Sequence, residues 1–397
     1  MRIQTVLTPD YAGRLVAREA AEALTALGLR VTVKDSAFFS GRNIARLFAL
    51  PPDRSGMDAH PDLFFTVNFH GLDREGEQFA AFERAGVPVA VWLVDNPWNQ
   101  LSGLRSDFWK KTRLFVTDDA FVAPLRDAGA VHVRHLPLAA NPAFHTPADA
   151  PGGPCAPLAP FVFVGRSAFP DKERFFVGLR VDEALLDDAR ALMRTGERPD
   201  FDWWARTMHL DTQPLWPGGT ARRISLGAEE SSAAWRTACL AAVPVEEMTI
   251  FGDEGWRTAL ASGVGADACV GEGSAVRRDL RPPVDYYGVL PRIYRAAEFS
   301  LNMTSFLLPR GLTQRHFDVW TAGGFLLTDA TPGLELFPDA LTRPITFSKP
   351  EDIPVLAEYF RKNPEEKRAL AQSWRQELSV AHGYTDRMRV VLADVSG

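Results

Sequence analysis

Arg315 and Asp318 are two residues whose types and spacing suit ligand chemistry. They lie three positions apart in the run Arg315-His316-Phe317-Asp318-Val319-Trp320, in which Phe317 and Trp320 recur at helical spacing. Both side chains would share one helix face near the N-terminus, where anions are favoured. A guanidinium binds phosphate oxygens and a carboxylate binds sugar hydroxyls, so the pair fits a nucleotide diphosphate. An ordinary amphipathic helix with an internal ion pair explains the same residues.

The two adjacent glycines Gly323 and Gly324 are predicted to end this helix, because glycine adopts the positive φ that a helix C-terminus needs. The apolar run that follows, Phe325-Leu326-Leu327-Thr328, is typical of a short buried strand, and Asp329 closes it. A helix, a glycine turn and a buried strand form one unit of a parallel α/β sheet.

The segment from Arg315 to Asp329 resembles the signature of group 1 glycosyltransferases, in which an acidic residue precedes a glycine turn and a buried strand. It is most similar to the CgeB-type (spore maturation protein) branch, which has Arg-x-Phe-Glu/Asp before that turn. The resemblance implies the GT-B fold, an α/β architecture of two Rossmann-like domains facing across a cleft. It also implies that Asp318 binds the ribose, although Asp reaches less far than the usual Glu.

A second motif begins at the strand Phe161-Val162-Phe163-Val164, which runs into Gly165 and Arg166, with Lys172 six residues on. It resembles the Gly-Arg…Lys element by which group 1 glycosyltransferases hold the donor pyrophosphate. In CgeB-type proteins an arginine further on often does this, and Arg174 is in a place to supply it. A guanidinium and an ammonium at a strand end suit a diphosphate, while solvation of a surface loop is the alternative.

The same resemblance implies further donor contacts in the second half of the chain. The residues after Gly288 would receive the nucleotide base through backbone groups, and the end of the strand 299–303 would lie beside the phosphates. The loop 306–314 would bring an arginine to the same place. The residues predicted on this basis are Tyr287, Gly288, Val289, Leu290, Asn302, Thr304 and Arg310, together with Gly323 and Gly324 of the turn.

In the N-terminal half, the catalytic candidates Asp95 and His70 follow apolar strands at 87–94 and 63–67. Open α/β sheets bind ligands at the carboxyl ends of their strands. Asp95 is the first choice for a base that activates the acceptor, since partial burial would raise its pKa, and Trp98 would form an apolar platform for a sugar ring. A hydrogen-bonded loop histidine and an Asx-turn before proline are the alternatives.

The N-terminal half opens with a Rossmann-like strand, helix and strand, but G-x-G-x-x-G is missing after the first strand, so no dinucleotide site is expected there. The runs from Trp92 to Pro97 and from His135 to Pro142 look like a domain that accompanies CgeB-type proteins. We expect an N-terminal acceptor domain, a Pro/Gly/Ala linker, a nucleotide-sugar domain with a helical insertion, and a terminal helix that braces the first domain. Their bounds are 1–145, 146–160, 161–378 with the insertion 173–245, and 379–397.

The amino-acid composition limits the classes of protein to which this chain can belong. The net charge of −6 argues against a nucleic-acid partner, and 26 Phe with 10 Trp suffice to fill two cores. Cys155, Cys239 and Cys269 show no CxxC spacing, so a reducing cytoplasm is expected and a zinc site is not. No apolar run of 18 residues and no signal-peptide pattern occur, so a cytoplasmic protein without a membrane span is expected.

The predicted function is transfer of a sugar from a UDP- or GDP-linked donor to an acceptor, which is a glycan, a protein or a small molecule. Arginines and a helix N-terminus neutralise the leaving diphosphate in this architecture, so the enzyme is expected to be a metal-independent, hexosyltransferase-like protein without a cofactor. Three aromatic residues of the insertion, Trp203, Trp204 and Trp216, are expected to pack in a core rather than to stack on sugars. A nucleotide-sugar epimerase and a non-catalytic binding protein of the same fold are the two alternatives.

Overall fold

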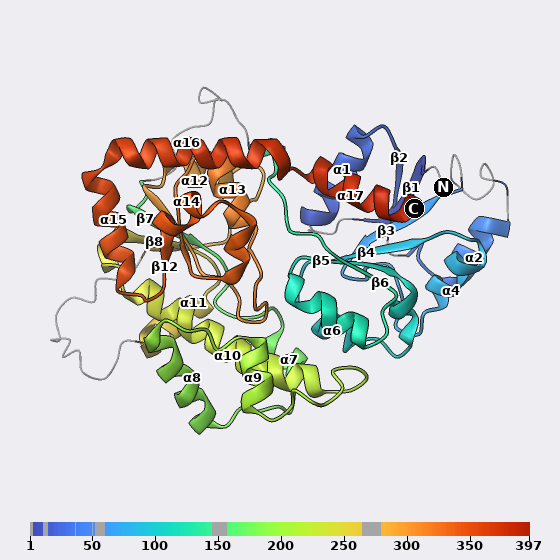
Figure 1. Cartoon of the computed structure of the whole chain (residues 1–397), viewed down its shortest axis with the longest axis horizontal. Helices are drawn as coiled ribbons and strands as arrows, with labels where there is room; N and C mark the ends of the chain where they lie inside the picture. Colours follow the sequence, from blue (N-terminus) through green and yellow to red (C-terminus); the bar gives the residue numbers. More distant parts are fainter. Residues whose placement is uncertain are drawn as a thin grey trace. The chain divides into compact units, whose positions relative to one another are not determined.

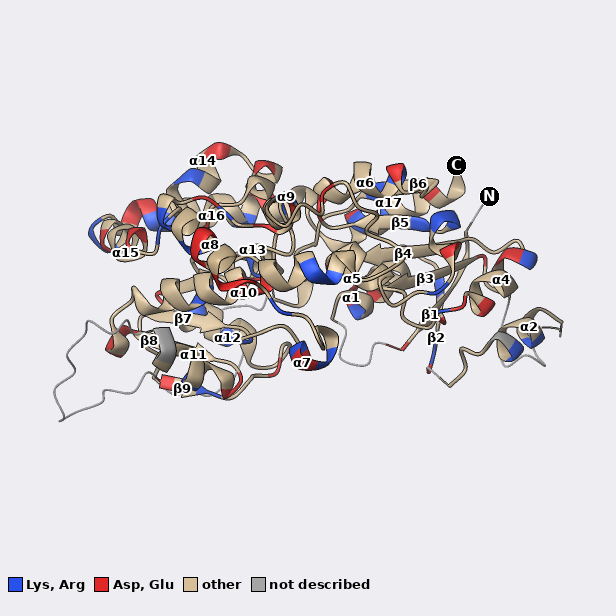
Figure 2. Cartoon of the chain, turned by 90° about the horizontal axis from the view of Figure 1, so that it is seen from below, with Lys and Arg blue, Asp and Glu red and all other residues tan. Residues whose placement is uncertain are grey.

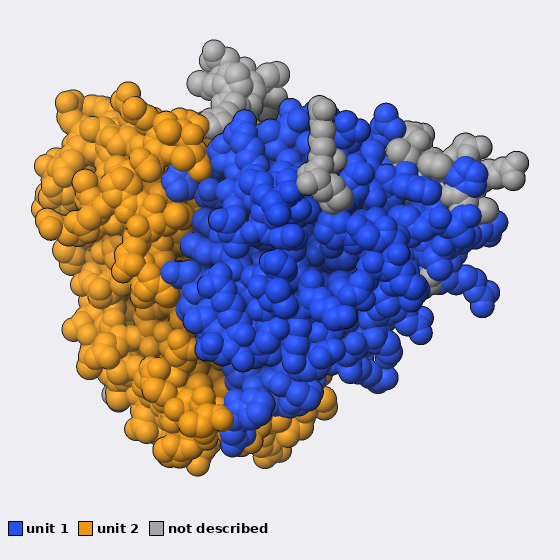
Figure 3. All heavy atoms as spheres, turned by 45° about the vertical axis from the view of Figure 1, so that its right-hand side comes forward, with its two compact units in different colours: residues 1–139, 213–222, 382–397 blue, residues 140–212, 223–381 orange. Residues whose placement is uncertain are grey.

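The computed structural model describes residues 3–10, 15–35, 37–49, 51, 60–144, 157–263 and 279–397. Most of the predicted linker 146–160, with Cys155, and also Cys269 lie outside the described residues. The chain divides into two compact units (Figure 3). Unit 1 comprises Met1–Ala139, Gln213–Arg222 and His382–Gly397, and unit 2 comprises Ala140–Thr212 and Arg223–Ala381.

Unit 1 is built on a six-stranded parallel sheet in the order β2-β1-β3-β4-β5-β6 (Figure 1). Its central strands β3 and β4 are buried at every position, because runs such as Leu-Phe-Phe-Thr-Val present apolar side chains to both faces. In this order β2 is added on one side of β1, and β3 and the later strands are added on the other side. The crevice in which such sheets bind ligands is therefore flanked by β1 and β3. The strands are β1 Thr5–Pro9, β2 Arg30–Lys34, β3 Leu63–Val67, β4 Val89–Leu93, β5 Arg113–Val116 and β6 His132–His135.

The helices of unit 1 come from both ends of the chain. The last helix, α17, packs against the first, α1, as the labels side by side in Figure 1 also show. The buried Arg387 of α17 donates hydrogen bonds to the carbonyl oxygens of Pro137 and Leu138, which follow β6. The helices are α1 Leu15–Ala26, α2 Gly41–Ala49, α4 Glu77–Arg84, α5 Pro97–Leu101, α6 Val122–Asp127 and α17 Tyr384–Ser396.

Unit 2 contains a second six-stranded parallel sheet, in the order β12-β11-β10-β7-β8-β9. Its switch of direction falls between β7 and β10, which are direct neighbours. The ends of these two strands are therefore the expected ligand crevice of this sheet. The strands are β7 Phe161–Val164, β8 Met248–Phe251, β9 Asp279–Arg281, β10 Phe299–Asn302, β11 Leu326–Asp329 and β12 Thr346–Phe347.

The helices of unit 2 include the predicted helical insertion, which consists mainly of α8, α9 and α10. The helix predicted at 231–242 is only the second half of α10, because Arg222, Arg223 and Gly227 weaken the apolar pattern of the first half. The helices are α7 Lys172–Phe175, α8 Glu183–Thr195, α9 Phe201–Thr207, α10 Thr220–Ala241, α11 Gly255–Gly263, α12 Leu290–Ala296, α13 Arg315–Thr321, α14 Asp339–Thr342, α15 Asp352–Lys362 and α16 Pro364–Ala381.

One short stretch of the insertion, Gln213–Arg222, groups with unit 1 rather than with the domain predicted to contain it. The ring of Trp216 packs edge-on against Trp109 with centroids 5.6 Å apart, and Nζ of Lys110 lies 5.6 Å from the Trp216 ring centroid. Trp216 thus belongs to unit 1, whereas Trp203 and Trp204 of α9 belong to unit 2, where Trp204 is fully buried.

In Figure 2, Lys and Arg are interspersed with Asp and Glu along the ribbons of both units. Among the described residues, no helix combines the length and the apolar character needed to cross a membrane.

Candidate functional site

A pocket of about 520 Å³ lies at the carboxyl ends of β7 and β8, beside the switch point of the sheet in unit 2. Three residues predicted to hold the donor line it: Gly165, Arg166 and Lys172. Arg166 is exposed, whereas Lys172 is more enclosed and pairs with Glu230 at 2.8 Å. The pocket therefore brings together two cationic side chains, one of them available to a ligand without displacing a protein partner.

Gly165 is required here because the guanidinium of Arg315 lies directly against it. A Cβ on Gly165 would be 2.7 Å from Nη2 of Arg315 and 2.8 Å from the Phe163 ring. Nε and Nη2 of Arg315 donate to the carbonyl oxygen of Val164, and Nη1 donates to Oδ1 of Asn302 at 3.0 Å. Arg315, which was predicted to bind phosphate, thus ties α13 to the ends of β7 and β10.

Asn302 belongs to a buried hydrogen-bond network between β10, β11 and α13. Its Nδ2 donates to Oγ1 of Thr328 at 3.0 Å, and its Oδ1 accepts from Oγ1 of Thr313 at 2.8 Å. The ring of His316 is fully buried and lies 3.0 Å from the same Thr328 oxygen. Desolvation lowers the pKa of His316 to about 3, so the imidazole is neutral.

Asp318, the predicted ribose ligand, is buried with 1% of its surface exposed. Its Oδ2 accepts a hydrogen bond of 2.6 Å from the Tyr286 hydroxyl, and its Oδ1 accepts one of 2.9 Å from Nε2 of Gln314. Arg315 and Asp318 share a helix, as predicted, but their side chains go to different partners. Both carboxylate oxygens of Asp318 therefore already accept a hydrogen bond from a protein side chain.

Thr304, at the end of β10, is bound to Asp329, at the end of β11. The buried Asp329 carboxylate accepts from the backbone N and from Oγ1 of Thr304, both at 2.9 Å. Nη1 of Arg198, from the loop between α8 and α9, lies 3.1 Å from Oδ2 of Asp329. The sequence contained no signal for Arg198, because nothing in a surface-like insertion indicates which arginine folds back onto the sheet.

The other predicted donor residues are spread more widely. Arg310 pairs with Glu335 at 2.6 Å instead of pointing to the pocket at β7. Tyr287, Gly288 and Val289 form the turn that leads to Leu290, the first residue of α12. The backbone N of Gly288 donates to Oδ1 of Asp285, while its carbonyl oxygen accepts from Arg292, so both groups already have partners.

The two glycines after α13 have structural roles that explain their presence. Gly323 has φ of +87° and ends the helix, as predicted. A Cβ on Gly324 would lie 2.4 Å from the carbonyl oxygen of Tyr294, so only glycine allows α12 and this turn to approach so closely. Neither glycine lines the pocket at β7.

In unit 1, both catalytic candidates lie at strand ends, each with a polar partner. Nε2 of His70 lies 3.2 Å from Oδ1 of Asp10, which places this pair at the ends of β3 and β1, on either side of the switch point. Asp95 follows β4 and accepts a hydrogen bond from Asn68, which follows β3. Asp10 and Asn68 were not predicted, although a polar residue after each apolar strand was a usable signal.

The pKa of Asp95 is raised, because surrounding protein desolvates the carboxylate more than the Asn68 hydrogen bond stabilises its ionised form. The residue as a whole is nevertheless exposed to solvent. The helix cap that follows uses Asn96, whose Oδ1 accepts from the backbone N of Trp98 at 2.9 Å. The predicted platform at Trp98 is wrong, because only 2% of this residue is exposed.

Within the described ranges, no three His, Cys, Asp or Glu side chains gather in a metal-binding cluster. Asp200-Phe201-Asp202 spells Asp-x-Asp, a sequence often associated with metal-bound nucleotide sugars. In this chain Asp200 caps α9 by accepting a hydrogen bond of 2.9 Å from the backbone N of Trp203. Metal independence stays a prediction.

Residues 234–393 match a family model described as glycosyl transferase-like. No curated protein matches the chain. Solved structures match over its whole length: an alpha-glucosyltransferase in complex with UDP-glucose and DNA containing an abasic site has 8% identity and a TM-score of 0.53, with 100% of both chains covered. Anabaena HepE in complex with UDP-glucose has 10% identity and a TM-score of 0.51, and an E. coli structure described as trehalose-6-phosphate bound with UDP-2-fluoro glucose has 11% and 0.50, each with 99% of both chains covered.

These similarities and the two six-stranded parallel sheets show a GT-B fold, which confirms the predicted fold class. The match over residues 234–393 adds support for a glycosyltransferase. The narrower assignment to the CgeB-type branch stays a prediction.

Proposed function

We propose that this protein is a glycosyltransferase that takes a sugar from a nucleotide-diphosphate donor bound in unit 2. The observation that carries the proposal is the pocket at the end of β7, where Arg166 and Lys172 lie beside the switch point of a parallel sheet. An exposed guanidinium and a partly enclosed ammonium match the oxygens of a diphosphate. UDP is the first nucleotide to test, because several structures with this fold were solved with UDP or UDP-glucose.

The role of Arg315 in this proposal differs from the one predicted. Its guanidinium is bound to Val164 and Asn302, so it positions the Gly165 turn on which the diphosphate would lie. Arg166 is then the main cation for the phosphates. Lys172 would contribute once a phosphate oxygen competes with Glu230 for its ammonium group.

For the acceptor, we propose the strand ends of unit 1. Asp95 is the base that removes a proton from the acceptor hydroxyl, since its raised pKa makes it a stronger base than an ordinary aspartate. The His70–Asp10 pair at the neighbouring switch point is the second candidate. The chemical class of the acceptor is a hydroxyl compound.

Calorimetric titration of UDP and GDP tests the donor site. Arg166→Ala should weaken diphosphate binding by about 1.5–3 kcal/mol, the scale of a charge-assisted hydrogen bond. Arg194→Ala is the matched control, because Arg194 is an exposed arginine of α8 that does not line the pocket. An equal effect in both variants, or no nucleotide binding by the wild type, contradicts the proposed site.

Turnover distinguishes the transferase from the alternatives. Incubation with UDP-sugars and a mixture of hydroxyl acceptors should release UDP and form a glycoside. An epimerase would instead return the same nucleotide with an isomerised sugar. A binding protein would show calorimetric binding with no change in the donor.

A further inference from the structure

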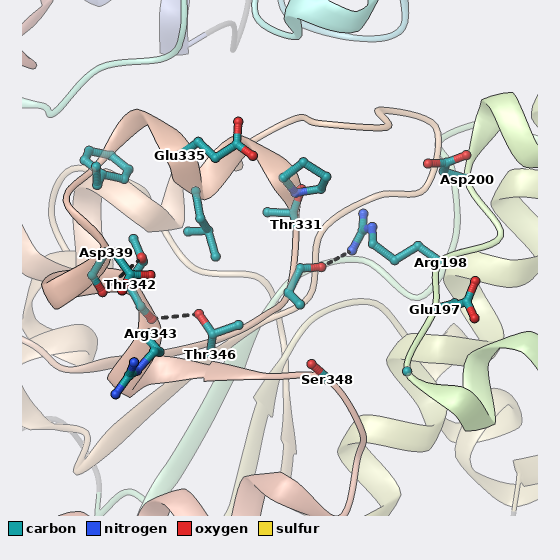
Figure 4. Close-up of a pocket in the computed structure, with 15 residues that line it drawn as sticks. Glu197, Arg198, Asp200, Thr331, Glu335, Asp339, Thr342, Arg343, Thr346 and Ser348 are labelled. Carbon is teal, nitrogen blue, oxygen red and sulfur yellow. Dashed lines mark hydrogen bonds between the residues drawn. The ribbon is translucent and has the colours of Figure 1, made fainter.

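A second cavity of about 760 Å³ lies in unit 2, where it opens at the ends of β11 and β12 (Figure 4). It is bounded by the loop Gly196–Asp200 on one side and by residues 330–348 on the other. None of the predicted donor residues lines it. Its volume is within the range of roughly 300–1,000 Å³ that is usual for small-molecule sites.

Two residues that line this cavity have polar atoms without hydrogen-bond partners among the described residues. They are Arg198, through its buried Nε and Nη2, and Thr331, through its buried Oγ1. The hydrogen bonds of Arg198 to described residues all use Nη1, which donates to Thr304, Asp329 and the carbonyl oxygen of Ala330. Thr331 occupies the N-cap position of the short helix Pro332–Leu336, but its side chain makes no capping hydrogen bond to that helix. Buried polar atoms are rarely left unpaired in a native protein, so these atoms need a partner other than the described protein atoms, either ordered water or a bound molecule.

The charges around the cavity define the chemistry of that molecule. Its lining has more acidic than basic side chains: Glu197, Asp200, Glu335 and Asp339 against Arg198 and Arg343. An anion would be repelled by this excess of carboxylates. A cation would leave the N–H groups of Arg198 unpaired, because it carries no acceptor for them.

A hydroxyl group meets both requirements, since its oxygen accepts from a guanidinium and its hydrogen donates to a carboxylate. Further hydroxyls from Thr342, Thr346 and Ser348 line the same cavity, and Pro332 offers an exposed apolar surface to a sugar ring. Figure 4 shows Arg198 entering from one side, with Thr342 and Arg343 on the other. The lining thus surrounds a polyhydroxylated ligand with donors, acceptors and an apolar face.

We propose that this cavity binds an uncharged saccharide, at a site separate from the nucleotide-sugar pocket at β7. On binding, the Arg198 side chain turns about its Nη1 contacts so that Nη2 reaches a sugar hydroxyl, while Thr331 pairs with a second hydroxyl. The site does not depend on the transferase activity proposed above.

Saturation-transfer difference NMR of the full chain tests this with four probes: maltose, cellobiose, lactose and trehalose. Saturating UDP is present to occupy the donor pocket, so that binding of a probe sugar to that pocket does not explain the signal. At least one probe should bind the wild type. Thr331→Val should weaken its binding roughly fivefold or more, since it removes one hydroxyl of a ligand hydrogen bond and keeps the shape. Glu197→Gln alters an exposed carboxylate on the wall of the cavity opposite Thr331. Combined with Thr331→Val, it should weaken saccharide binding further.

The control is Thr237→Val, because the Thr237 hydroxyl bonds to Ala233 within α10 and does not line the cavity. It should leave saccharide binding unchanged. Thr331→Val should fold as well as the wild type, since the hydroxyl it removes has no hydrogen-bond partner in the described part of the chain. If no probe binds, or if the cavity variants bind as tightly as Thr237→Val, the proposal is overturned. UDP affinity is measured in the same samples, so failure of the donor site is recognised separately.

Discussion

Nδ2 of Asn68 lies 2.7 Å from Oδ2 of Asp95, so the loop after β3 holds the carboxylate that follows β4. Asn68 is fixed from the other side as well, because its Oδ1 accepts from the backbone N of Val94 at 3.0 Å. Its φ of 52° is left-handed, a conformation that Asn adopts more readily than most residues. The loop is therefore shaped to orient Asp95.

Replacing Asn68 should change the pH dependence of transfer. Desolvation of the carboxylate by the surrounding protein raises the pKa of Asp95, and the Asn68 hydrogen bond lowers it. Asn68→Ala removes the lowering contribution, so the pKa rises further and less of the base is ionised at acidic pH. The acidic limb of the kcat/KM profile should move to higher pH in this variant.

Asp95→Asn provides the comparison for that experiment. It should reduce the rate by roughly 10²–10⁴-fold and leave UDP affinity intact, as expected for loss of a general base. A pH profile that is identical in the wild type and in Asn68→Ala would assign Asp95 a structural role.

Gly165→Ala should destabilise unit 2 and weaken nucleotide binding. The new methyl group would meet Arg315 at 2.7 Å and Phe163 at 2.8 Å, so the guanidinium that supports the turn must move. We expect a loss of about 1–3 kcal/mol in the free energy of unfolding, measured with urea. Gly103→Ala is the control, because its Cβ would meet only the Gln100 carbonyl oxygen, at 3.6 Å. Equal stability of both variants would show that Arg315 is not packed against Gly165.

His316 should make unit 2 less stable at acidic pH. Its pKa is about 3, below its ordinary value of 6.5, so the unfolded chain binds this proton more readily than the folded chain. Stability from this group is complete above pH 6.5 and is lost progressively as the pH falls toward 3.

NMR titration of the imidazole C–H resonances checks this directly. The His316 signal should not titrate above pH 4, and the exposed His132 supplies the control variant for the unfolding experiment. In parallel, urea unfolding of His316→Gln should show a shallower pH dependence than His132→Gln. A His316 resonance that titrates near pH 6.5 would contradict its burial in the Asn302–Thr328 network.

Tyr286→Phe should separate the two possible roles of Asp318. It frees Oδ2 of Asp318 from the 2.6 Å hydrogen bond without changing the shape of the ring. If Asp318 binds ribose, this variant should bind UDP at least as tightly as the wild type, and 2′-deoxy-UDP less tightly than UDP. Asp318→Asn should then lose the preference for the ribose hydroxyls. Equal affinity for UDP and 2′-deoxy-UDP in all three proteins would leave Asp318 as a structural partner of Tyr286.

The fold was predictable in the segments where apolar runs and glycine turns give a clear local signal in the sequence. The helix that ends at Gly323, the strand Leu326–Asp329 after it, and the buried strands Leu63–Val67 and Met248–Phe251 all follow from local pattern. The edge strand Asp279–Arg281 was missed, because three residues with charges at both ends carry no strand signal.

The candidate site was predictable in its location more than in its contacts. The pattern placed Arg166 and Lys172 at a strand end correctly, because strand and loop follow each other in sequence. The contacts depend on residues more than thirty positions away in the chain. Such residues decide whether Arg315 binds phosphate or the Val164 carbonyl oxygen, and whether Asp318 binds ribose or the Tyr286 hydroxyl. Tertiary packing determines such pairings, and the periodicity of apolar residues in the sequence does not predict them.

Unit 1 is assembled from three separated stretches of chain, and its first helix packs against the last helix, α17. On the ribosome, the strands of this unit emerge early, yet α17 is made only after all of unit 2. The surface of α1 that α17 covers therefore stays exposed until α17 has been synthesised. A nascent chain stalled before His382 should expose this apolar surface to chaperones, although the strands of unit 1 have already been made.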